Sequence, residues 1–359
     1  MHTTEVDAMR QALALAWRGW GHVHPNPMVG AVVLAGGRAV GEGYHAEYGG
    51  PHAERSALEA AGARAVGATM VVSLEPCAHL GKQPPCVEAL AAAGVRRVVA
   101  AVADPNPVAA GGARKLEAAG IEVVIGLLEE EARRLNAAFF HRFSTSDRPW
   151  VALKLSTSLD FRIADASGRS RWISGEASRG FVHQLRAGFD AIAVGSRTAR
   201  RDDPSLTVRG MITPRVAPRR IVFAGSTPLP ETLTLVRTAR DVPTAVVLPP
   251  DAPEPAAVRL EQLGVETLRA SSLAEALRSL RRSGVDTLLI EGGGRLAGGL
   301  LAAGLVDRFY WIQAPIWLGS RGAPAVSGWD IETLEAAERW TATDRRALGD
   351  DTLLVLDRA

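Results

Sequence analysis

The sequence predicts an α/β protein with two domains. Its 359 residues exceed the length of a typical single domain and suggest roughly two, each large enough to bury its own core. Helical segments alternate with short apolar runs along most of the chain, as in sheets covered by helices. A polar stretch that ends in Pro149 interrupts this alternation. We therefore predict one domain over residues 1–146 and a second over residues 147–359.

The first domain is expected to be a layered sheet with helices on its faces. Gly36 and Gly37 mark a hairpin between its first two strands, and Gly94 and Gly120 stand where helices should end. The apolar runs predict strands at residues 29–34, 38–43, 69–74, 97–102 and 121–125, and helices near 5–18, 53–64, 86–93, 112–119 and 129–140.

The second domain continues the alternation. Residues 197–219 and 313–350 carry many prolines and arginines, and we expect them to be loops, the former near a ligand. No internal repeat is visible. The pattern predicts strands at residues 150–155, 191–195, 220–224, 244–248, 287–290, 308–312 and 352–356, and helices near 176–187, 255–263, 273–282 and 294–303.

The composition favours a small-molecule partner. The chain has 41 basic and 39 acidic residues and a net charge of +2, which does not suggest a general surface for nucleic acid or a membrane. No stretch approaches the ~20 apolar residues of a membrane span, and the first helix, with Glu5 and Asp7, is unlike a signal peptide. We therefore expect a cytoplasmic protein whose two cysteines, Cys77 and Cys86, serve a metal or catalysis rather than a disulfide.

The strongest chemical signal combines His52 and Glu54 with the two cysteines, each of which follows a proline. One neutral imidazole and two thiolates can hold a catalytic zinc ion and leave a position open for water. Glu54, near a predicted helix start, could carry protons without ligating the metal, as in zinc-dependent nucleobase deaminases. Both cysteines fall at or near predicted helix starts, where free N–H groups favour thiolates.

Other interpretations of these residues stay open at this point. Eight residues separate Cys77 from Cys86, whereas the short form of the deaminase motif has two residues between its cysteines. Each residue taken alone could be an ordinary buried cysteine or a surface histidine. A non-catalytic zinc protein would need a fourth protein ligand, and His79 is the candidate for it.

Six short runs are more specific: HPNPMVG at residues 24–30, GEGYH at 41–45, PHAE at 51–54, EPCAH at 75–79, PPC at 84–86 and DPNP at 104–107. Together they resemble the deaminase half of the bacterial bifunctional riboflavin-biosynthesis deaminase/reductase family, whose cysteines have this wider spacing. The resemblance implies a cytidine-deaminase-like α/β/α domain with zinc on His52, Cys77 and Cys86, and Glu54 as the proton shuttle. It also implies a substrate pocket lined by Asn26, His45, His79 and either Asp104 or Asn106.

Three polar runs in the second half could bind phosphates. EGGGRLA at residues 291–297 lies between a predicted strand and a helix, where glycines let backbone N–H groups approach a phosphate. It does not fit the Gly-x-Gly-x-x-Gly fingerprint of dinucleotide folds. The other two runs are GSRTARRDDPSLTVR at 195–209 and KLSTSLD at 154–160, the latter with Ser170 and Trp172 downstream.

These runs resemble, in this order, the reductase half of the same family, which has a dihydrofolate-reductase-like α/β fold. Phe161 stands where the family has glycine, close to where cofactor or substrate should approach. The resemblance implies that NADPH contacts Ser156, Trp172, Thr198, Asp202 and the turn formed by Gly293, Gly294, Arg295, Leu296, Ala297, Gly298 and Gly299. It implies that Ser170, Arg186, Leu206, Arg209 and Glu291 hold the substrate, with the two arginines on its 5-phosphate.

The resemblance implies a two-step enzyme with zinc and NADPH as cofactors. The first step is hydrolytic deamination of 2,5-diamino-6-(5-phosphoribosylamino)pyrimidin-4(3H)-one, and the second reduces the ribosyl group to give 5-amino-6-(5-phosphoribitylamino)uracil. Lys154, Asp202 or a water could donate the proton of the reduction. A dimer or tetramer through the reductase half is also implied. The rival classes are a nucleic-acid base deaminase, for which the chain shows little basic or aromatic surface, and a non-catalytic zinc-binding protein.

Overall fold

A computed structural model describes residues 3–210, 212–225 and 229–358 of the chain. The chain divides into two compact units, Met1–Thr145 and Ser146–Ala359. Met1 and Ala359, with which the two predicted domains begin and end, lie outside the described residues. Each unit is described by itself below.

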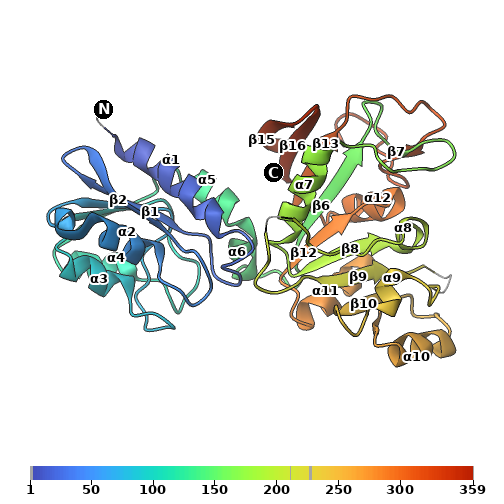
Figure 1. Cartoon of the computed structure of the whole chain (residues 1–359), viewed down its shortest axis with the longest axis horizontal. Helices are drawn as coiled ribbons and strands as arrows, with labels where there is room; N and C mark the ends of the chain where they lie inside the picture. Colours follow the sequence, from blue (N-terminus) through green and yellow to red (C-terminus); the bar gives the residue numbers. More distant parts are fainter. Residues whose placement is uncertain (1–2, 211, 226–228, 359) are drawn as a thin grey trace. The chain divides into compact units, whose positions relative to one another are not determined.

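A five-stranded sheet forms the centre of the first unit (Figure 1). Its strand order is β2-β1-β3-β4-β5, with β1 antiparallel to both neighbours and β3, β4 and β5 parallel. The strands are β1 (Gly30–Ala35), β2 (Arg38–Tyr44), β3 (Thr69–Val72), β4 (Arg97–Ala100) and β5 (Glu122–Ile125).

Helices cover both faces of this sheet, because successive apolar side chains of a strand point to opposite faces. On β1, Ala31 and Val33 belong to the core on one face, whereas Val32 and Leu34 belong to the core on the other. The predicted three-layer α/β/α arrangement is confirmed. The first face packs against α2 (Ala53–Ala61), α3 (Cys86–Ala92) and α4 (Gly112–Ala118), and the second against α1 (Glu5–Ala16), α5 (Glu129–Leu135) and α6 (Ala137–Arg142).

The single helix predicted over residues 129–140 is wrong, because Asn136 separates α5 from α6 with φ −107° and ψ 27°. Its buried side chain accepts a hydrogen bond from the Met28 N–H at 2.9 Å and donates one to the Met28 carbonyl at 2.8 Å. A buried backbone segment needs partners for both groups, and the Asn136 amide supplies them. Asn136, at the break between the two helices, therefore holds the loop that carries Asn26 in place.

A nine-stranded sheet forms the centre of the second unit, in the order β11-β10-β9-β8-β12-β6-β13-β16-β15. The strands from β11 to β13 are parallel, and β16 and β15 extend the sheet in antiparallel fashion. A separate ribbon pairs β7 (Arg162–Ala164) with β14 (Ala323–Pro324). The strands of the large sheet are β6 (Trp150–Thr157), β8 (Ala191–Gly195), β9 (Arg219–Phe223), β10 (Thr244–Leu248), β11 (Glu266–Arg269), β12 (Thr287–Glu291), β13 (Arg308–Gln313), β15 (Trp340–Leu348) and β16 (Asp351–Arg358).

The parallel part of this sheet is also buried on both faces. Side chains of α11 (Leu273–Arg282) and α12 (Gly294–Ala302) join the core on one face. The core on the other face includes residues of α8 (Ser196–Asp202), α9 (Thr234–Arg237) and α10 (Glu254–Gln262). The remaining helix, α7 (Glu176–Arg186), packs Phe181 against Tyr310 of β13. The predicted α/β class of this half is confirmed.

Two segments predicted to be loops are partly regular, so the prediction for 197–219 and 313–350 is wrong there. Residues 196–202 form α8, in which only Ala199 is buried, so the segment shows no apolar period. Residues 340–348 form β15, an edge strand whose side chains are all at least partly exposed. Edge strands often carry charged residues instead of an alternating apolar pattern.

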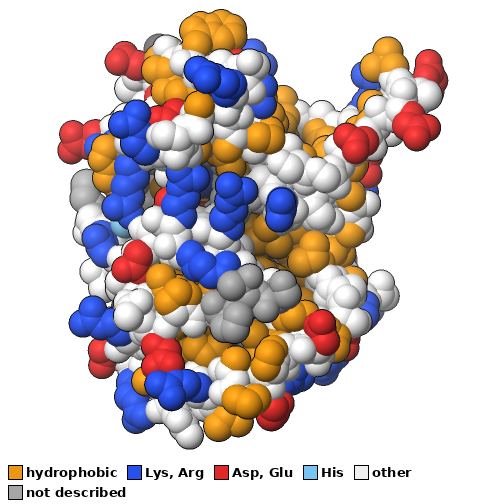
Figure 2. All heavy atoms as spheres, turned by 90° about the vertical axis from the view of Figure 1, so that its right-hand side faces the viewer, with side chains coloured by type: hydrophobic (Ala, Val, Ile, Leu, Met, Phe, Trp, Pro, Cys, Tyr) orange, Lys and Arg blue, Asp and Glu red, His pale blue; other side chains and the backbone are white. Residues whose placement is uncertain are grey.

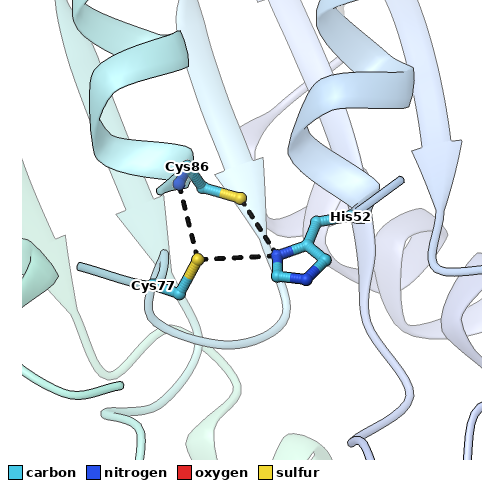
Figure 3. A group of neighbouring side chains, drawn as sticks. All are labelled: His52, Cys77 and Cys86. Carbon is cyan, nitrogen blue, oxygen red and sulfur yellow. Dashed lines mark hydrogen bonds between the residues drawn. The ribbon is translucent and has the colours of Figure 1, made fainter. Parts of the chain in front are cut away.

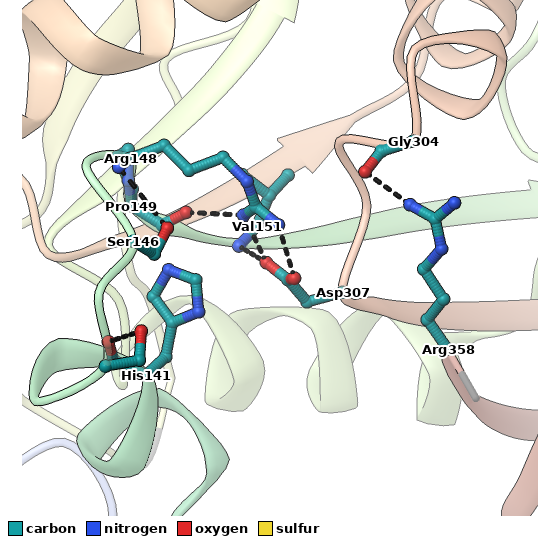
Figure 4. Close-up of polar contacts among 9 residues, drawn as sticks. His141, Ser146, Arg148, Pro149, Val151, Gly304, Asp307 and Arg358 are labelled. Carbon is teal, nitrogen blue, oxygen red and sulfur yellow. Dashed lines mark hydrogen bonds and ion pairs between the residues drawn. The ribbon is translucent and has the colours of Figure 1, made fainter.

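An ion pair anchors the start of the second unit (Figure 4). The Arg148 guanidinium donates to both carboxylate oxygens of Asp307, at 2.6 and 2.7 Å, and to the Pro149 carbonyl at 2.9 Å. Asp307 also accepts the Val151 N–H at 2.7 Å. Because both side chains are only 18% exposed, this geometry registers the first strand of the unit, β6, against the segment before β13.

We expect Asp307→Ala to destabilise the second unit by about 3 kcal/mol, because it leaves a largely buried guanidinium and a strand N–H without their acceptor. The measurement is urea unfolding followed by tryptophan fluorescence, since Trp150, Trp172, Trp311, Trp317, Trp329 and Trp340 lie in this unit. Asp344→Ala removes a half-exposed carboxylate that pairs with Arg346 and should cost less than about 0.5 kcal/mol. Equal effects of the two substitutions would contradict the anchoring role.

Candidate functional site

His52, Cys77 and Cys86 come together at the start of two helices (Figure 3). His52 is the residue before α2, Cys86 is the first residue of α3, and Cys77 lies in the irregular segment after β3. The His52 Nδ1 atom is 3.3 Å from the Cys86 Sγ atom and 3.5 Å from the Cys77 Sγ atom. All three potential ligand atoms lie within 4.8 Å of one another.

The ionisation of this cluster favours a bound cation. The hydrogen bond with Cys86 lowers the pKa of the Cys77 thiol, whereas the same contact, together with burial, raises the pKa of Cys86. Burial likewise raises the pKa of the Glu54 carboxyl, which is 3% exposed. A divalent metal ion would let both sulfurs ionise beside a carboxylate. One nitrogen and two sulfur ligands are a donor set that fits zinc and leaves a coordination position open.

The predicted deaminase residues line one cavity of about 460 Å³. His45 donates from Nδ1 to the Pro51 carbonyl at 3.0 Å, because that oxygen can only accept. In the neutral ring Nε2 is then the acceptor for the Asn26 amide, 3.1 Å away, and burial lowers the pKa of His45. The lining includes Asn26, His45, His52, Glu54, Cys77, His79, Asp104 and Asn106, whereas Cys86 is fully buried behind it.

Glu75 is a functional candidate that the sequence reasoning did not assign. Its buried carboxylate accepts the Asp104 N–H at 3.0 Å and the Ala113 N–H at 2.9 Å. It thereby fixes the loop in which Asp104 in turn accepts the Asn106 N–H at 2.9 Å. Burial raises the pKa of Asp104 to about 6. The buried Nδ1 atom of His79 has no hydrogen-bond partner among the described residues, and the residue belongs to the lining of the cavity.

Further lining residues come from places that no motif marked. The Lys82 ammonium lies 4.1 Å from the Tyr48 ring centroid, and the Gln83 amide donates to the Gly49 carbonyl at 2.9 Å. In the sequence, Lys82 and Gln83 were marked only by their place between Cys77 and Cys86. Three more lining residues, Phe139, Arg142 and Phe143, come from the α6 region, where nothing but helical spacing could have pointed to them.

A second cavity, of about 620 Å³, lies in the second unit at the carboxyl ends of β8, β9 and β12. In the turn after β12, Gly292 and Gly293 adopt φ values of +74° and +92°, which favour glycine. A Cβ atom on Gly294 would lie 2.6 Å from the Pro324 carbonyl oxygen, so only glycine fits there. The predicted residues in the lining are Ser170, Thr198, Asp202, Gly293, Gly294, Arg295 and Leu296.

Other predicted cofactor residues lie outside this lining. Ala297 and Gly298 are buried in α12, and a Cβ atom on Gly298 would lie 2.1 Å from the Ser327 carbonyl oxygen, which indicates a packing role. Gly299, on the same helix, faces Leu273 of α11. Ser156 on β6 has a buried hydroxyl with no hydrogen-bond partner among the described residues. Trp172 is 69% exposed, with the Arg179 guanidinium carbon 4.7 Å from its ring centroid.

Two of the predicted substrate residues, Arg186 and Glu291, form a charged cluster next to the glycine turn, whereas the Leu206 side chain is buried in the core. Arg186 donates to both Glu291 oxygens, at 2.5 and 2.9 Å, and to the Thr207 carbonyl at 2.9 Å. Although burial alone would raise it, the pKa of Glu291 is lowered by Arg186. Lys154 neighbours Glu291 on the adjacent strand, and burial lowers its pKa against the opposing effect of that carboxylate. The Arg209 N–H donates to the His183 Nδ1 atom at 3.2 Å.

Phe161 occupies a left-handed backbone conformation, with φ +59°, which explains why glycine suits this position. Its ring packs edge-on against Trp311 with centroids 5.3 Å apart. The ring is not part of the lining of the cavity at the glycine turn. In the structure Phe161 therefore contributes to packing beneath the β7–β14 ribbon.

Family models match both halves of the chain. Residues 2–102 match the cytidine and deoxycytidylate deaminase zinc-binding region, and residues 149–354 match the RibD C-terminal domain. The riboflavin biosynthesis protein RibD of Escherichia coli (strain K12) is 41% identical over 362 residues, 97% of this chain and 98% of the relative. That of Aquifex aeolicus (strain VF5) is 38% identical over 353 residues, 98% and 97% of the two chains.

The chain belongs to the RibD family of riboflavin biosynthesis. Solved structures agree: Acinetobacter baumannii RibD, form 1, has a TM-score of 0.83 at 38% identity, with 99% of both chains covered. A diaminohydroxyphosphoribosylaminopyrimidine deaminase/5-amino-6-(5-phosphoribosylamino)uracil reductase from Thermotoga maritima has a TM-score of 0.81 at 32% identity, also over 99% of both. As a RibD protein, the chain is a bifunctional deaminase and reductase with a zinc-binding deaminase domain, and the expected cytidine-deaminase-like and dihydrofolate-reductase-like halves are confirmed.

We expect Cys86→Ala in this RibD protein to lower bound zinc from about one ion per chain to below about 0.1, because two ligands do not hold zinc as three do. His79→Ala should keep about one zinc ion, since His79 is not part of the ligand cluster. Metal analysis of the purified variants checks both. Loss of zinc from the His79 variant would indicate a site closed by four protein ligands.

Proposed function

We propose that the first unit deaminates 2,5-diamino-6-(5-phosphoribosylamino)pyrimidin-4(3H)-one and that the second reduces the ribosyl group of the product, giving 5-amino-6-(5-phosphoribitylamino)uracil. The observation that carries the proposal is that Glu54 lies beside the His52, Cys77 and Cys86 cluster and lines the same cavity as His52 and Cys77. The two reactions after which the similar Thermotoga maritima protein is named support the choice of substrates.

In the deaminase site His52, Cys77 and Cys86 would hold zinc, whose role is to polarise a water for attack on the amine-bearing carbon. The buried Glu54 carboxyl accepts a proton from that water and returns one to the departing ammonia. Its place beside the metal ligands and within the cavity suits both tasks. The Asn26–His45 pair, the unpartnered His79 nitrogen and Asp104 or Asn106 orient the pyrimidine and its ribosyl arm.

The phosphate of the deaminase substrate is assigned to Lys82. Its ammonium lies over the Tyr48 ring among the residues that line the cavity. A flexible cation of this kind binds phosphate as a point charge.

In the reductase site the cofactor is a nicotinamide, which would supply a hydride, that is, two electrons and one proton, and we propose NADPH. Ser156, Trp172, Thr198, Asp202 and the turn from Gly293 to Leu296 are its contacts. Basic side chains gather on the face shown in Figure 2. Three arginines, Arg197, Arg201 and Arg295, line the cavity. Such an arginine-rich lining favours the cofactor with the additional phosphate.

The substrate of the reduction binds beside this turn. Ser170, Leu206 and Glu291 are assigned to it, and Arg186 and Arg209 to its 5-phosphate. In the structure the guanidinium of Arg186 donates to Glu291 and Thr207, so of the two arginines Arg209 is the one not held by an ion pair with Glu291. Lys154, with its lowered pKa, can hold and release a proton near the new C–H bond; Asp202 and a water are the other candidates. Among the described residues, no helix combines the length and apolar character of a membrane span. A homo-oligomer and a cytoplasmic location stay predictions.

The test uses the full chain and follows ammonia release and oxidation of the reduced nicotinamide separately. We expect Glu54→Gln to keep zinc and to slow ammonia release by about 10²- to 10⁴-fold, because the amide cannot shuttle protons. Reduction of the already deaminated substrate should proceed at the wild-type rate. Near-wild-type ammonia release from the zinc-loaded variant would refute the role of Glu54. If the wild type showed no ammonia release, or no oxidation of the nicotinamide, the corresponding reaction of the proposal would be refuted.

We expect NADPH to raise the melting temperature of the full chain more than NADH at the same concentration, because a ligand that binds the folded state more tightly stabilises it more. Differential scanning calorimetry measures the shifts. The Glu54→Gln variant is the control and should show the same difference, since its change lies in the other unit. Equal shifts with both cofactors would refute the choice of NADPH.

A further inference from the structure

The loop from Asp203 to Arg209 follows α8 and carries two of the residues to which the proposed function assigns the reductase substrate, Leu206 and Arg209. It meets the charged cluster at two points. The Thr207 carbonyl accepts from Arg186 at 2.9 Å, and the Arg209 N–H donates to His183. The orientation of this loop therefore determines the position of Arg209 and of the Thr207 carbonyl that accepts from Arg186.

The start of the loop caps a short helix elsewhere in the unit. Asp203 accepts the Thr234 N–H at 2.7 Å with one oxygen and the Thr234 hydroxyl at 2.8 Å with the other. Thr234 is the first residue of α9, and its own N-cap, Leu233, offers no side-chain acceptor. Asp203 thus does for α9 what an N-cap side chain usually does, but from 31 residues away.

The other end of α9 is held by a buried arginine that also contacts the loop. Arg220, on β9, is 1% exposed. Its guanidinium donates to the Leu235 carbonyl at 3.1 Å and to the Thr238 carbonyl at 3.0 Å, which satisfies acceptors at the end of the helix. The same guanidinium donates to the Ser205 carbonyl of the loop at 3.5 Å.

Directly after these two contacts the loop has an unfavourable backbone conformation. Leu206 has φ +48°, which costs energy for a residue with a Cβ atom. Its side chain is 3% exposed and belongs to the same core cluster as Leu235 and Val236 of α9. Such a conformation persists only where surrounding contacts determine it, and here α9 contributes Leu235 and Val236 to the core cluster that holds the Leu206 side chain.

We propose that α9 is the element that positions the substrate loop of the reductase site, with Asp203 and Arg220 as its positioning residues. This inference rests on the proposed substrate role of Arg209. Loss of the Asp203 cap releases the start of the loop, so Thr207 and Arg209 no longer stand ready for the phosphorylated substrate. The defect concerns substrate binding because Lys154 and the glycine turn stay in place.

The experiment measures steady-state reduction by the full chain with the deaminated phosphoribosyl substrate. We expect Asp203→Ala to raise the KM for that substrate about five- to tenfold, which corresponds to loss of a cap and its accessory bond, while kcat stays within about twofold. Asp203→Asn keeps one acceptor oxygen and should recover most of the affinity. Thr234→Val removes only the hydroxyl contact and should have an intermediate effect.

Glu231→Ala is the matched control, because it removes an exposed carboxylate three positions before Thr234 that pairs with Arg259 instead. It should leave the KM unchanged. An unchanged KM in Asp203→Ala, or a loss that Glu231→Ala reproduces, overturns the positioning role. Arg209→Ala tests the substrate site independently of α9. An unchanged KM in Arg209→Ala refutes the proposed substrate site. A raised KM in Arg209→Ala together with normal kinetics in Asp203→Ala refutes only the role of α9.

Discussion

Both sites depend on balancing charge that the fold has removed from water. In the first unit, two sulfurs and the Glu54 carboxyl are buried together, and only a cation between them lets all three groups carry charge. In the second unit, Glu291 is compensated within the protein by the bidentate Arg186 and by Lys154 on the neighbouring strand. In the first site, a metal ion would therefore balance the buried negative charge. In the second site, the Arg186–Glu291 ion pair balances its own charge, and other arginines nearby can bind anions.

Much of this arrangement could be predicted from sequence because its signals are local. The helix and strand alternation reflects apolar periodicity, and His52, Glu54, Cys77 and Cys86 were identified by their spacing and residue types. The break at Asn136 could not be predicted, since its cause is a hydrogen bond to Met28, 108 residues away. The same holds for α8 and β15, whose exposed side chains give no apolar period.

The residues that sequence reasoning missed act through the backbone or from a distant element. Glu75 stands in a recognised run, but its importance lies in the N–H groups of Asp104 and Ala113, which no side-chain pattern reveals. Phe139 and Arg142 belong to a helix without catalytic motifs. Conversely, Ala297 and Gly298 were assigned to the cofactor from their position in a glycine-rich run, whereas their surroundings are those of packed helix residues.

The two hydrogen bonds between the Asn136 side chain and the Met28 backbone also determine how much of the chain a working deaminase needs. The match to the zinc-binding region ends at residue 102, and a fragment cut there would retain every metal ligand. It would lack the amide that fastens the Asn26 loop, the DPNP loop held by Glu75 and the α6 wall of the cavity. Such a fragment would also lose Ala109, which packs with Cys77 and Cys86 and accepts the Ala78 N–H at 3.1 Å, so in this chain both the metal cluster and the substrate pocket depend on residues beyond the matched region.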